Sequence, residues 1–314
     1  MIYYLVTSQH SYTVRHYLRS WSSGQELART VQVVPYSALP GNLDMPGGAY
    51  VFSDLERLGP RQRELASGVW DRLAAAGDAV RLHNHPLRSL RRFELLSCLS
   101  ERGQNRFRAH RPTAPGQPWR YPVFVRHERE HTGNLSSLLH SAEEVRVVLL
   151  KLILDGHDLS DLLVVELCDT ADEEGIYRKY SAFRVGDRIL PRHVLFSRQW
   201  MQKDLDLLEP AHREEIRAYC RTNPHREQLL SLFELAGIDY GRIDYSVLDG
   251  QIQVWEINTN PIVVRPPDEY AAETLAFHDA FARLFGEALG ALNVRTSPTA
   301  RIPMGWQSVA VWGS

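Results

Sequence analysis

Over residues 1–90, short apolar segments of strand length alternate with segments of helical periodicity. Apolar residues recur at helical spacing at Leu65, Val69, Leu73 and Ala76. The pattern predicts strands at residues 2–6, 31–36, 49–52 and 79–82, with helices at 12–21 and 61–76. Such alternation is typical of a mostly parallel sheet with helices on its faces. We therefore expect a Rossmann-like N-terminal domain, although the glycine pattern G-x-G-x-x-G is absent.

The pattern changes after residue 113, where paired strands become frequent. Residues 113–119 hold two prolines and a glycine together with polar residues, which indicates a loop or linker. Gly186-Asp187 and Asp249-Gly250 each separate two alternating apolar runs, and such dipeptides favour hairpin turns. Further strands are predicted at 121–126 and 162–167, and helices at 145–154, 214–221, 226–236 and 268–289. The fold class predicted for the whole chain is α/β (α+β).

Composition narrows the functional classes. The 314 residues carry a net charge of −2, with 44% hydrophobic and 24% charged residues, which is an ordinary globular composition. A balanced charge disfavours nucleic acid as a partner, and no apolar run is long enough to suggest a membrane span. The N-terminus does not look like a signal peptide. Cys98, Cys168 and Cys220 are scattered without C-x-x-C spacing, so we expect a reducing, cytoplasmic setting.

The second predicted hairpin, residues 241–258, carries the most informative chemistry. Asp244 lies on its first strand, and Glu256 and Asn258 lie two apart on its second strand, so the last two share a face. The hairpin is expected to bring the three side chains together. An acidic pair inside apolar runs is costly unless it is paired or binds a metal. Carboxylate and amide oxygens are the ligands that Mg²⁺ prefers, particularly when phosphate oxygens complete the shell.

This hairpin resembles the metal-binding end of the ATP-grasp superfamily, whose pattern is an Asp, a turn and then Glu-x-Asn with a Pro close behind. Asp244, Glu256, Asn258 and Pro261 match it. The resemblance implies an N-terminal pre-ATP-grasp domain at 1–112 and an ATP-grasp domain at 113–292, followed by a C-terminal tail at 293–314. The ATP-grasp domain would divide into subdomains at about 113–168 and 169–292. It also implies ATP and Mg²⁺ as cofactors.

The activity that the resemblance implies is a glutathione synthetase-like carboxylate–amine ligation. The substrates would be small-molecule or peptide acids and amines, and a homodimer is compatible with the family. An acyl phosphate would form first, and an amine would then displace phosphate to give an amide.

Further site residues follow from the same resemblance. Arg126 would replace the usual lysine of a strand that precedes a phosphate-binding loop containing Gly133. Glu166, Leu167 and Cys168 would form the hinge strand whose backbone contacts adenine, and Lys179 would contact the nucleotide's phosphates. Arg192 or His193 would contact the acyl phosphate, and Arg242 would meet phosphate or a substrate carboxylate.

Two other interpretations remain open at this stage. His127-Glu128-Arg129-Glu130-His131 matches the H-E-x-x-H pattern of zinc proteases, in which two histidines on a helix bind the metal. The preceding β-branched and aromatic run favours a strand there instead, and Thr132-Gly133-Asn134 favours a turn. The second interpretation is an ATP-grasp protein that binds nucleotide with reduced catalysis, because Arg126 stands where lysine is usual.

Overall fold

A parallel sheet with covering helices begins the fold. The computed structural model describes residues 1–41, 44–113, 119–131, 133–201, 207–293 and 301–304. The sheet order is β2-β1-β4-β5, and all of its pairings are parallel. Its strands are β1 (Ile2–Val6), β2 (Val31–Pro35), β4 (Gly48–Phe52) and β5 (Val80–His83). Helices α1 (Tyr12–Ser20) and α2 (Ser22–Leu27) connect β1 to β2, and α3 (Pro60–Ala74) connects β4 to β5. The predicted strand–helix alternation is present, and its Rossmann-like assignment stays a prediction.

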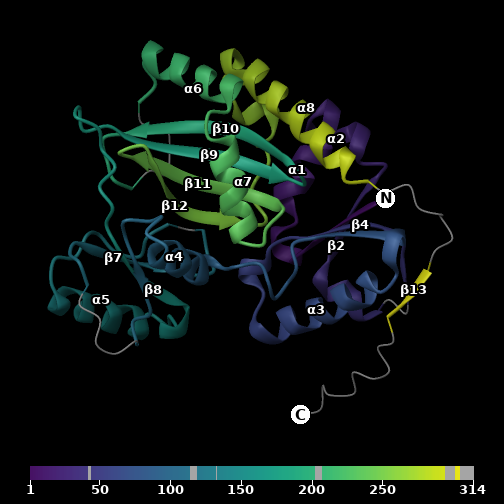
Figure 1. Ribbon diagram of the computed structural model, residues 1–314, viewed down its shortest axis with the longest axis horizontal. Helices are drawn as coiled ribbons and strands as arrows, with labels where there is room; N and C mark the ends of the chain where they lie inside the picture. The colour runs from purple at the N-terminus through teal and green to yellow at the C-terminus, as the bar shows by residue number, and fades with distance from the viewer. Residues whose placement is uncertain (42–43, 114–118, 132, 202–206, 294–300, 305–314) are drawn as a thin grey trace.

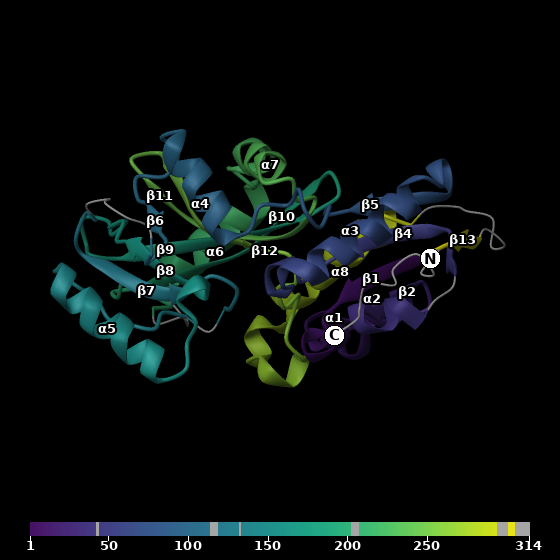
Figure 2. The same cartoon turned by 90° about the horizontal axis from the view of Figure 1, so that it is seen from below.

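A small antiparallel sheet follows at the opposite end of the molecule (Figure 2). Its order is β6-β8-β7, formed by β6 (Ala109–His110), β7 (Val123–His127) and β8 (Leu162–Glu166). Helix α5 (Ala142–Leu154) packs against β7 and β8 through Val145 and Leu152. Helix α4 (Arg92–Glu101) leads into this sheet from the parallel one.

The central sheet is antiparallel and has the order β10-β9-β11-β12 (Figure 1). It consists of two hairpins, β9 (Tyr177–Val185) with β10 (Arg188–Ser197), and β11 (Tyr240–Leu248) with β12 (Gln251–Asn258). Both turns fall at the predicted dipeptides. At the second turn, Asp249 and Gly250 have φ values of 49° and 76°, the left-handed pair that a type I′ turn requires.

Each face of the central sheet packs against different helices, because successive strand residues point to opposite faces. Ala182 and Ile243 pack against α4, α6 (Pro210–Thr222) and α7 (Arg226–Leu235). Phe183 and Tyr240 face the other way and pack against α1 and α8 (Leu275–Ala291). The second face continues past Tyr240 to Arg242 and Asp244, so the candidate site occupies the face that α8 covers only in part.

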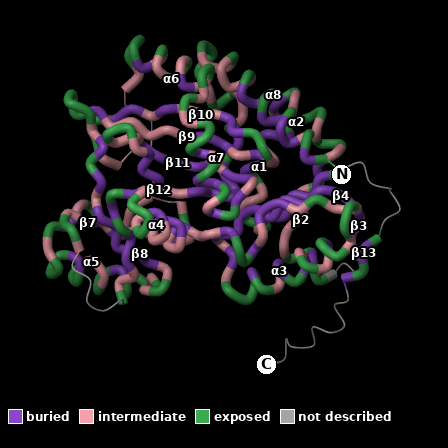
Figure 3. The backbone as a smooth tube through the Cα atoms, in the orientation of Figure 1, coloured by how far each residue is buried: buried purple, intermediate pink, exposed green. Residues whose placement is uncertain are grey.

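Two details differ from the predicted elements. The last long helix begins at Leu275 rather than at residue 268, because Pro266 and two short 3-10 turns precede it. Within the expected tail, β13 (Arg301–Pro303) pairs antiparallel with β3 (Asp44–Pro46), and Met304 is buried beside the parallel sheet. Buried backbone runs through the three larger sheets (Figure 3). In the described part of the chain, no helix combines the length and apolarity needed to cross a membrane.

Candidate active site

The β11–β12 hairpin places four polar side chains on one face. Its register sets Arg242 opposite Asn258 and Asp244 opposite Glu256. Directly opposed residues of antiparallel strands project to the same side, as do residues two apart. The register thus places the three candidate metal ligands on one face of the hairpin, and their role as ligands stays a prediction. A register shift after Asp244 leaves Trp255 as an extra residue, so Trp255 and Glu256 line the same cavity although they are consecutive.

Asp244 is held by its own strand and by the neighbouring one. Arg242 donates to both oxygens of its carboxylate, from Nε at 2.8 Å and from Nη2 at 3.0 Å. Ser181 on β9 donates its hydroxyl at 2.8 Å. Burial would lower the pKa of Arg242, but the charge and hydrogen bonds of Asp244 together with the charge of Glu256 outweigh burial and raise this pKa. The two hydrogen bonds fix the Arg242 guanidinium beside the carboxylate.

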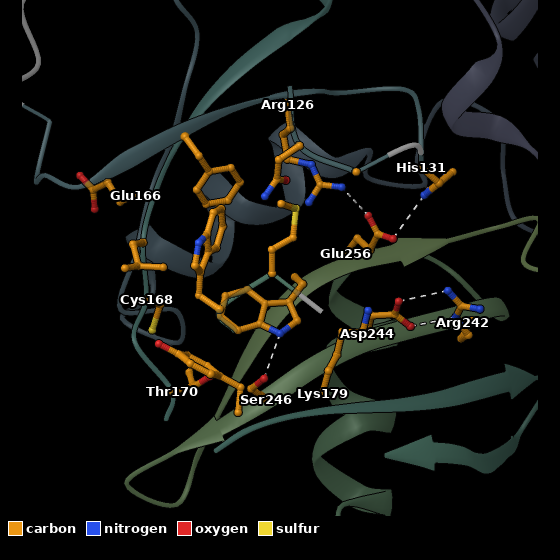
Figure 4. Close-up of a pocket in the computed structure, with 18 residues that line it drawn as sticks. Arg126, His131, Glu166, Cys168, Thr170, Lys179, Arg242, Asp244, Ser246 and Glu256 are labelled. Carbon is orange, nitrogen blue, oxygen red and sulfur yellow. Dashed lines mark hydrogen bonds and ion pairs between the residues drawn. The ribbon is translucent and has the colours of Figure 1, made fainter. Parts of the chain in front are cut away.

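Glu256 lies among three basic side chains from distant parts of the chain, and Figure 4 shows two of them, Arg126 and His131. Arg92 at the start of α4 donates to it, Arg126 on β7 donates at 3.0 Å, and His131 Nδ1 lies 3.3 Å away. Burial opposes ionisation of Glu256, but the positive charge of Arg92, His131 and Arg126 holds its pKa well below the usual range. Glu256 is therefore a carboxylate at neutral pH.

Sequence reasoning missed Arg92, which also organises the loop after β7. Its Nη1 donates to the carbonyls of His127 at 2.7 Å, Glu128 at 2.7 Å and Glu130 at 2.9 Å. No local pattern marks Arg92, because its partners come from a loop and a strand that meet α4 only after folding. A charged residue at the first helical position is otherwise unremarkable.

The donor set fits a magnesium ion in type. Asp244 and Glu256 supply carboxylate oxygens, and Asn258 supplies an amide oxygen on the same face. Asn258 Oδ1 accepts the N–H of Asn260 at 2.7 Å and keeps a second lone pair. Both carboxylates are engaged by arginines in this structure, so a bound cation would share them with guanidinium groups or displace those groups toward a ligand's phosphates.

A cavity of about 400 Å³ lies between the small sheet and the central sheet (Figure 4). All of the predicted nucleotide-binding residues line it, together with two of the metal-ligand candidates: Arg126, Gly133, Glu166, Leu167, Cys168, Lys179, Arg242, Asp244 and Glu256. The side chains of Phe124, Trp200 and Trp255 also line it, and the rings of Phe124 and Trp200 are 4.9 Å apart. The cavity thus has aromatic rings as well as a group of charged side chains.

The predicted hinge residues lie at this cavity, but their groups differ in availability. The backbone N–H groups of Glu166 and Leu167 donate to the carbonyls of Arg108 and Pro122, at 3.0 and 2.9 Å. The Glu166 carboxylate accepts the backbone N–H groups of Arg108 and Arg120, each at 3.1 Å. Of the three predicted hinge residues, Cys168 is therefore the best placed to offer its backbone to a ligand.

The remaining predicted residues lie at two neighbouring cavities. Asn258 and Arg242 line one of about 880 Å³ beside the parallel sheet. Arg192 and His193 line another of about 670 Å³, which also includes Lys179, Arg242 and Asp244. Burial and the charge of Arg192 hold the pKa of His193 well below its usual value, so His193 is neutral. Arg242 lines all three cavities and marks the point where they meet.

The zinc-protease interpretation is not supported. His127 ends the strand β7, so the two histidines do not lie on one helix. Glu128 pairs with Arg111 at 2.8 Å, while His131 contacts Glu56 and Glu256. Among the residues that the structure describes, no group of three or more His, Cys, Asp or Glu side chains is arranged to hold a metal ion. The H-E-x-x-H pattern falls where β7 ends and a loop begins, whereas a zinc protease site would need a helix there.

The fold is of the α/β type. A unit with a parallel sheet is followed by two antiparallel sheets, and a cavity lies between those two. No protein-family model matches the chain, and no curated protein matches it by sequence. Several solved structures do match the chain in fold. D-alanine–D-alanine ligase from Bacillus anthracis complexed with ATP has a TM-score of 0.51 and 12% identity, covering 93% of this chain and 96% of that one. A second structure of that ligase has a TM-score of 0.51 and 13% identity, with coverages of 93% and 97%.

The ATP-grasp ligase PsnB complexed with a minimal precursor variant, Mg and ADP has a TM-score of 0.49 and 13% identity, covering 93% and 96%. The chain has the ATP-grasp fold, as the hairpin pattern predicted. At these identities the likeness concerns the fold, and the function must be argued from the site.

Proposed function

We propose that this protein is an ATP-dependent carboxylate–amine ligase. The observation that carries the proposal is the 400 Å³ cavity, where Arg126, Lys179 and Arg242 stand beside the carboxylates of Asp244 and Glu256. Basic groups can bind the phosphates of a nucleoside triphosphate, and oxygen ligands beside them can hold its bound cation. The ATP-grasp fold and the D-alanine–D-alanine ligase neighbour support the same assignment.

The adenine is proposed to lie at the aromatic side chains of the cavity. Phe124, Trp200 and Trp255 offer apolar faces there, and Trp255 is oriented by its Nε1 donating to Ser246 Oγ at 3.0 Å. Aromatic faces accept a flat base by stacking. The backbone of Cys168 is the proposed contact for the adenine edge.

The triphosphate is proposed to lie along Arg126, Lys179 and Arg242. Burial and the charge of Arg92 lower the pKa of Arg126 to about 10, so Arg126 stays positive at neutral pH. Replacement of the usual lysine by arginine therefore keeps the charge and adds a fork suited to phosphate oxygens. Asp244, Glu256 and Asn258 are the proposed magnesium ligands, and bound Mg²⁺ would neutralise phosphate charge and draw electron density from the transferred group.

The chain's own residues orient the reactants and offset charge. The substrate carboxylate oxygen attacks the γ-phosphorus, ADP leaves, and an acyl phosphate forms. The amine nitrogen then attacks the carbonyl carbon, phosphate leaves, and the nitrogen loses a proton as the amide forms. Arg242 is fixed at the junction of the three cavities, where it can offset the negative charge that develops in both steps. No nucleophilic side chain is required.

A nucleotide-binding protein with reduced catalysis is the second candidate. The observation that favours it is the engagement of Glu256 by two arginines, Arg92 and Arg126, where a cation would have to compete. The two candidates differ in turnover: the ligase releases ADP when an acid and an amine are present, whereas the second candidate binds ATP with magnesium and releases none.

The test measures ATP-dependent thermal stabilisation and ADP release across a panel of acids and amines. The ligase proposal expects both signals in the native protein, and expects both to be lost in Asp244→Asn and Glu256→Gln. Asp249→Asn makes the same chemical change as the first variant in the exposed turn of the same hairpin, where the side chain is 69% exposed, and should behave as native. Stabilisation without ADP release across the panel would favour the second candidate. Stabilisation that survives in both site variants would refute the nucleotide site.

A further inference from the structure

The 670 Å³ cavity opens onto the proposed reaction centre from the side opposite the small sheet. It shares Lys179, Arg242 and Asp244 with the proposed nucleotide cavity. Its other walls come from β10, α6, the segment after β12 and the start of α8. A molecule bound here can therefore reach the same atoms as the nucleotide without occupying the nucleotide's space.

A bulge in β10 turns two consecutive side chains toward this cavity. The register with β9 shifts between Pro191 and His193, so Arg192 and His193 both project to the face that carries Ser181. His193 Nε2 lies 3.0 Å from Ser181 Oγ, which in turn donates to Asp244. Without the bulge, one of the two side chains would point into the opposite core.

Within the described parts of the chain, Arg192 is a buried cation without a carboxylate partner. Its residue is 6% exposed, and none of the ion pairs formed among the described residues includes it. Its Nη2 contacts the Tyr270 hydroxyl at 3.4 Å and His278 Nδ1 at 3.2 Å, and its guanidinium lies 4.6 Å from the centre of the Phe281 ring. Nη1 is buried and has no hydrogen-bond partner among the residues that the structure describes. An uncompensated buried charge is costly, so a ligand that supplies the missing anion would be stabilised here.

The partners of Arg192 do not supply that anion. Burial and the charge of Arg192 lower the pKa of His278 to about 3, so this histidine is neutral and accepts a hydrogen bond from the guanidinium. Tyr270 contributes a neutral hydroxyl, and the Tyr270 ring stacks on the His278 ring with centroids 3.7 Å apart. Both side chains therefore orient Arg192 while leaving its charge uncompensated.

The neighbouring cavity of 880 Å³ differs from the Arg192 cavity in how its arginines are paired. Its arginines each pair with an acid: Arg57 with Asp54, Arg129 with Asp161, and Arg242 with Asp244. In the Arg192 cavity, Arg213 and Arg265 also lack an ion-pair partner among the described residues. An excess of positive charge thus belongs to the Arg192 cavity and not to its neighbour. The walls also include apolar side chains from Ile216, Val263 and Phe277.

We infer that the Arg192 cavity binds an amine substrate that also carries a carboxylate and an apolar body, such as an apolar α-amino acid or a peptide with a free C-terminus. The carboxylate that does not react is held at Arg192, and the amine faces the centre at Arg242. The excess of positive charge disfavours polyamines, which carry no anion to offset it. The assignment of this molecule as the amine of a ligation rests on the proposed function.

The experiment compares carboxylates with matched neutral amides. Binding of L-phenylalanine, L-phenylalaninamide, Leu-Phe and Leu-Phe-amide is measured by calorimetry on the full chain in the absence of ATP. We expect each acid to bind roughly ten- to a hundredfold more tightly than its amide, the range of a charge-assisted hydrogen bond. Arg192→Gln should abolish this preference, and Arg192→Lys should keep part of it. Arg221→Gln, which removes a positive charge from the exposed side of α6, should leave the preference unchanged.

Equal binding of acid and amide by the native protein would overturn the inference, as would a preference that survives in Arg192→Gln. Absence of binding by all four probes at millimolar concentration would also overturn it. Failure of the ligase proposal has a different signature, because ADP release would then be absent while the preference for carboxylates remained measurable.

Discussion

Glu56 links three separate parts of the chain, and its replacement by glutamine tests the electrostatics of the site. Glu56 lies in a short 3-10 turn after β4 and is 7% exposed. Its Oε1 lies 3.1 Å from His131 Nε2, and its Oε2 accepts the Thr259 hydroxyl at 2.5 Å. His131 in turn contacts Glu256. The parallel sheet, the loop after β7 and the end of β12 therefore meet at one carboxylate.

The expected magnitude follows from the pKa of Glu56. Burial would raise it, but His131 and the Thr259 hydroxyl outweigh burial and lower the pKa from 4.5 to about 2. A shift of this size corresponds to about 3 kcal/mol of stability. Because the folded-state pKa lies below the unfolded value, the contribution is complete above about pH 5 and is lost as the pH falls from 4.5 toward 2.

Urea unfolding at two pH values measures the effect. We expect Glu56→Gln to lower the free energy of unfolding by about 3 kcal/mol near pH 7 and by only about 1 kcal/mol near pH 3. Glu64→Gln on the exposed side of α3 should change little at either pH. An equal deficit for Glu56→Gln at both pH values would refute the reasoning, because the loss would then come from packing rather than from the ionised carboxylate.

Three further variants test other parts of the site. Arg92→Met removes one of the cations that hold the buried Glu256 carboxylate and the side-chain donor of three loop carbonyls, so urea unfolding should show a loss of about 3 kcal/mol or more. The same change at exposed Arg102 should have little effect, and equal losses would contradict the argument. Gly241→Ala would place a Cβ 2.8 Å from the Asn258 carbonyl oxygen, so we expect a loss of about 1–3 kcal/mol and weaker stabilisation by magnesium and ATP; native stabilisation would show that the strand can shift freely. Arg126→Lys should retain ADP release, whereas Arg126→Gln should reduce it roughly a hundredfold; equal rates would remove Arg126 from the proposed phosphate contacts.

The local sequence pattern was sufficient to predict those elements whose structure depends on residues close together in the chain. The β11–β12 hairpin follows from alternating apolar residues around Asp249-Gly250. The turn alone would set Asp244 opposite Trp255, and the register shift between Asp244 and Tyr245 sets it opposite Glu256 instead. The same reasoning predicted a strand at 121–126 in place of a zinc-binding helix, and β7 ends one residue later, at His127. The start of α8 was predicted too early, because two 3-10 turns, Pro267–Glu269 and Ala272–Thr274, occupy the segment before Leu275.

The sequence by itself determined the two hairpins, the alternating N-terminal elements and the shared face of Glu256 and Asn258, because strand periodicity and turn chemistry act over a few residues. Only the tertiary structure, through the register shift that leaves Trp255 unpaired, added Asp244 to that face and decided what surrounds the two carboxylates. Arg92 and Glu256 are 164 residues apart, and Glu56 and Thr259 are 203 apart. The uncompensated charge of Arg192 likewise became visible only once the bulge, α8 and the 262–278 segment were in place. Whether a buried charge finds a partner depends on which distant segments pack around it, and no local pattern of residues carries that information.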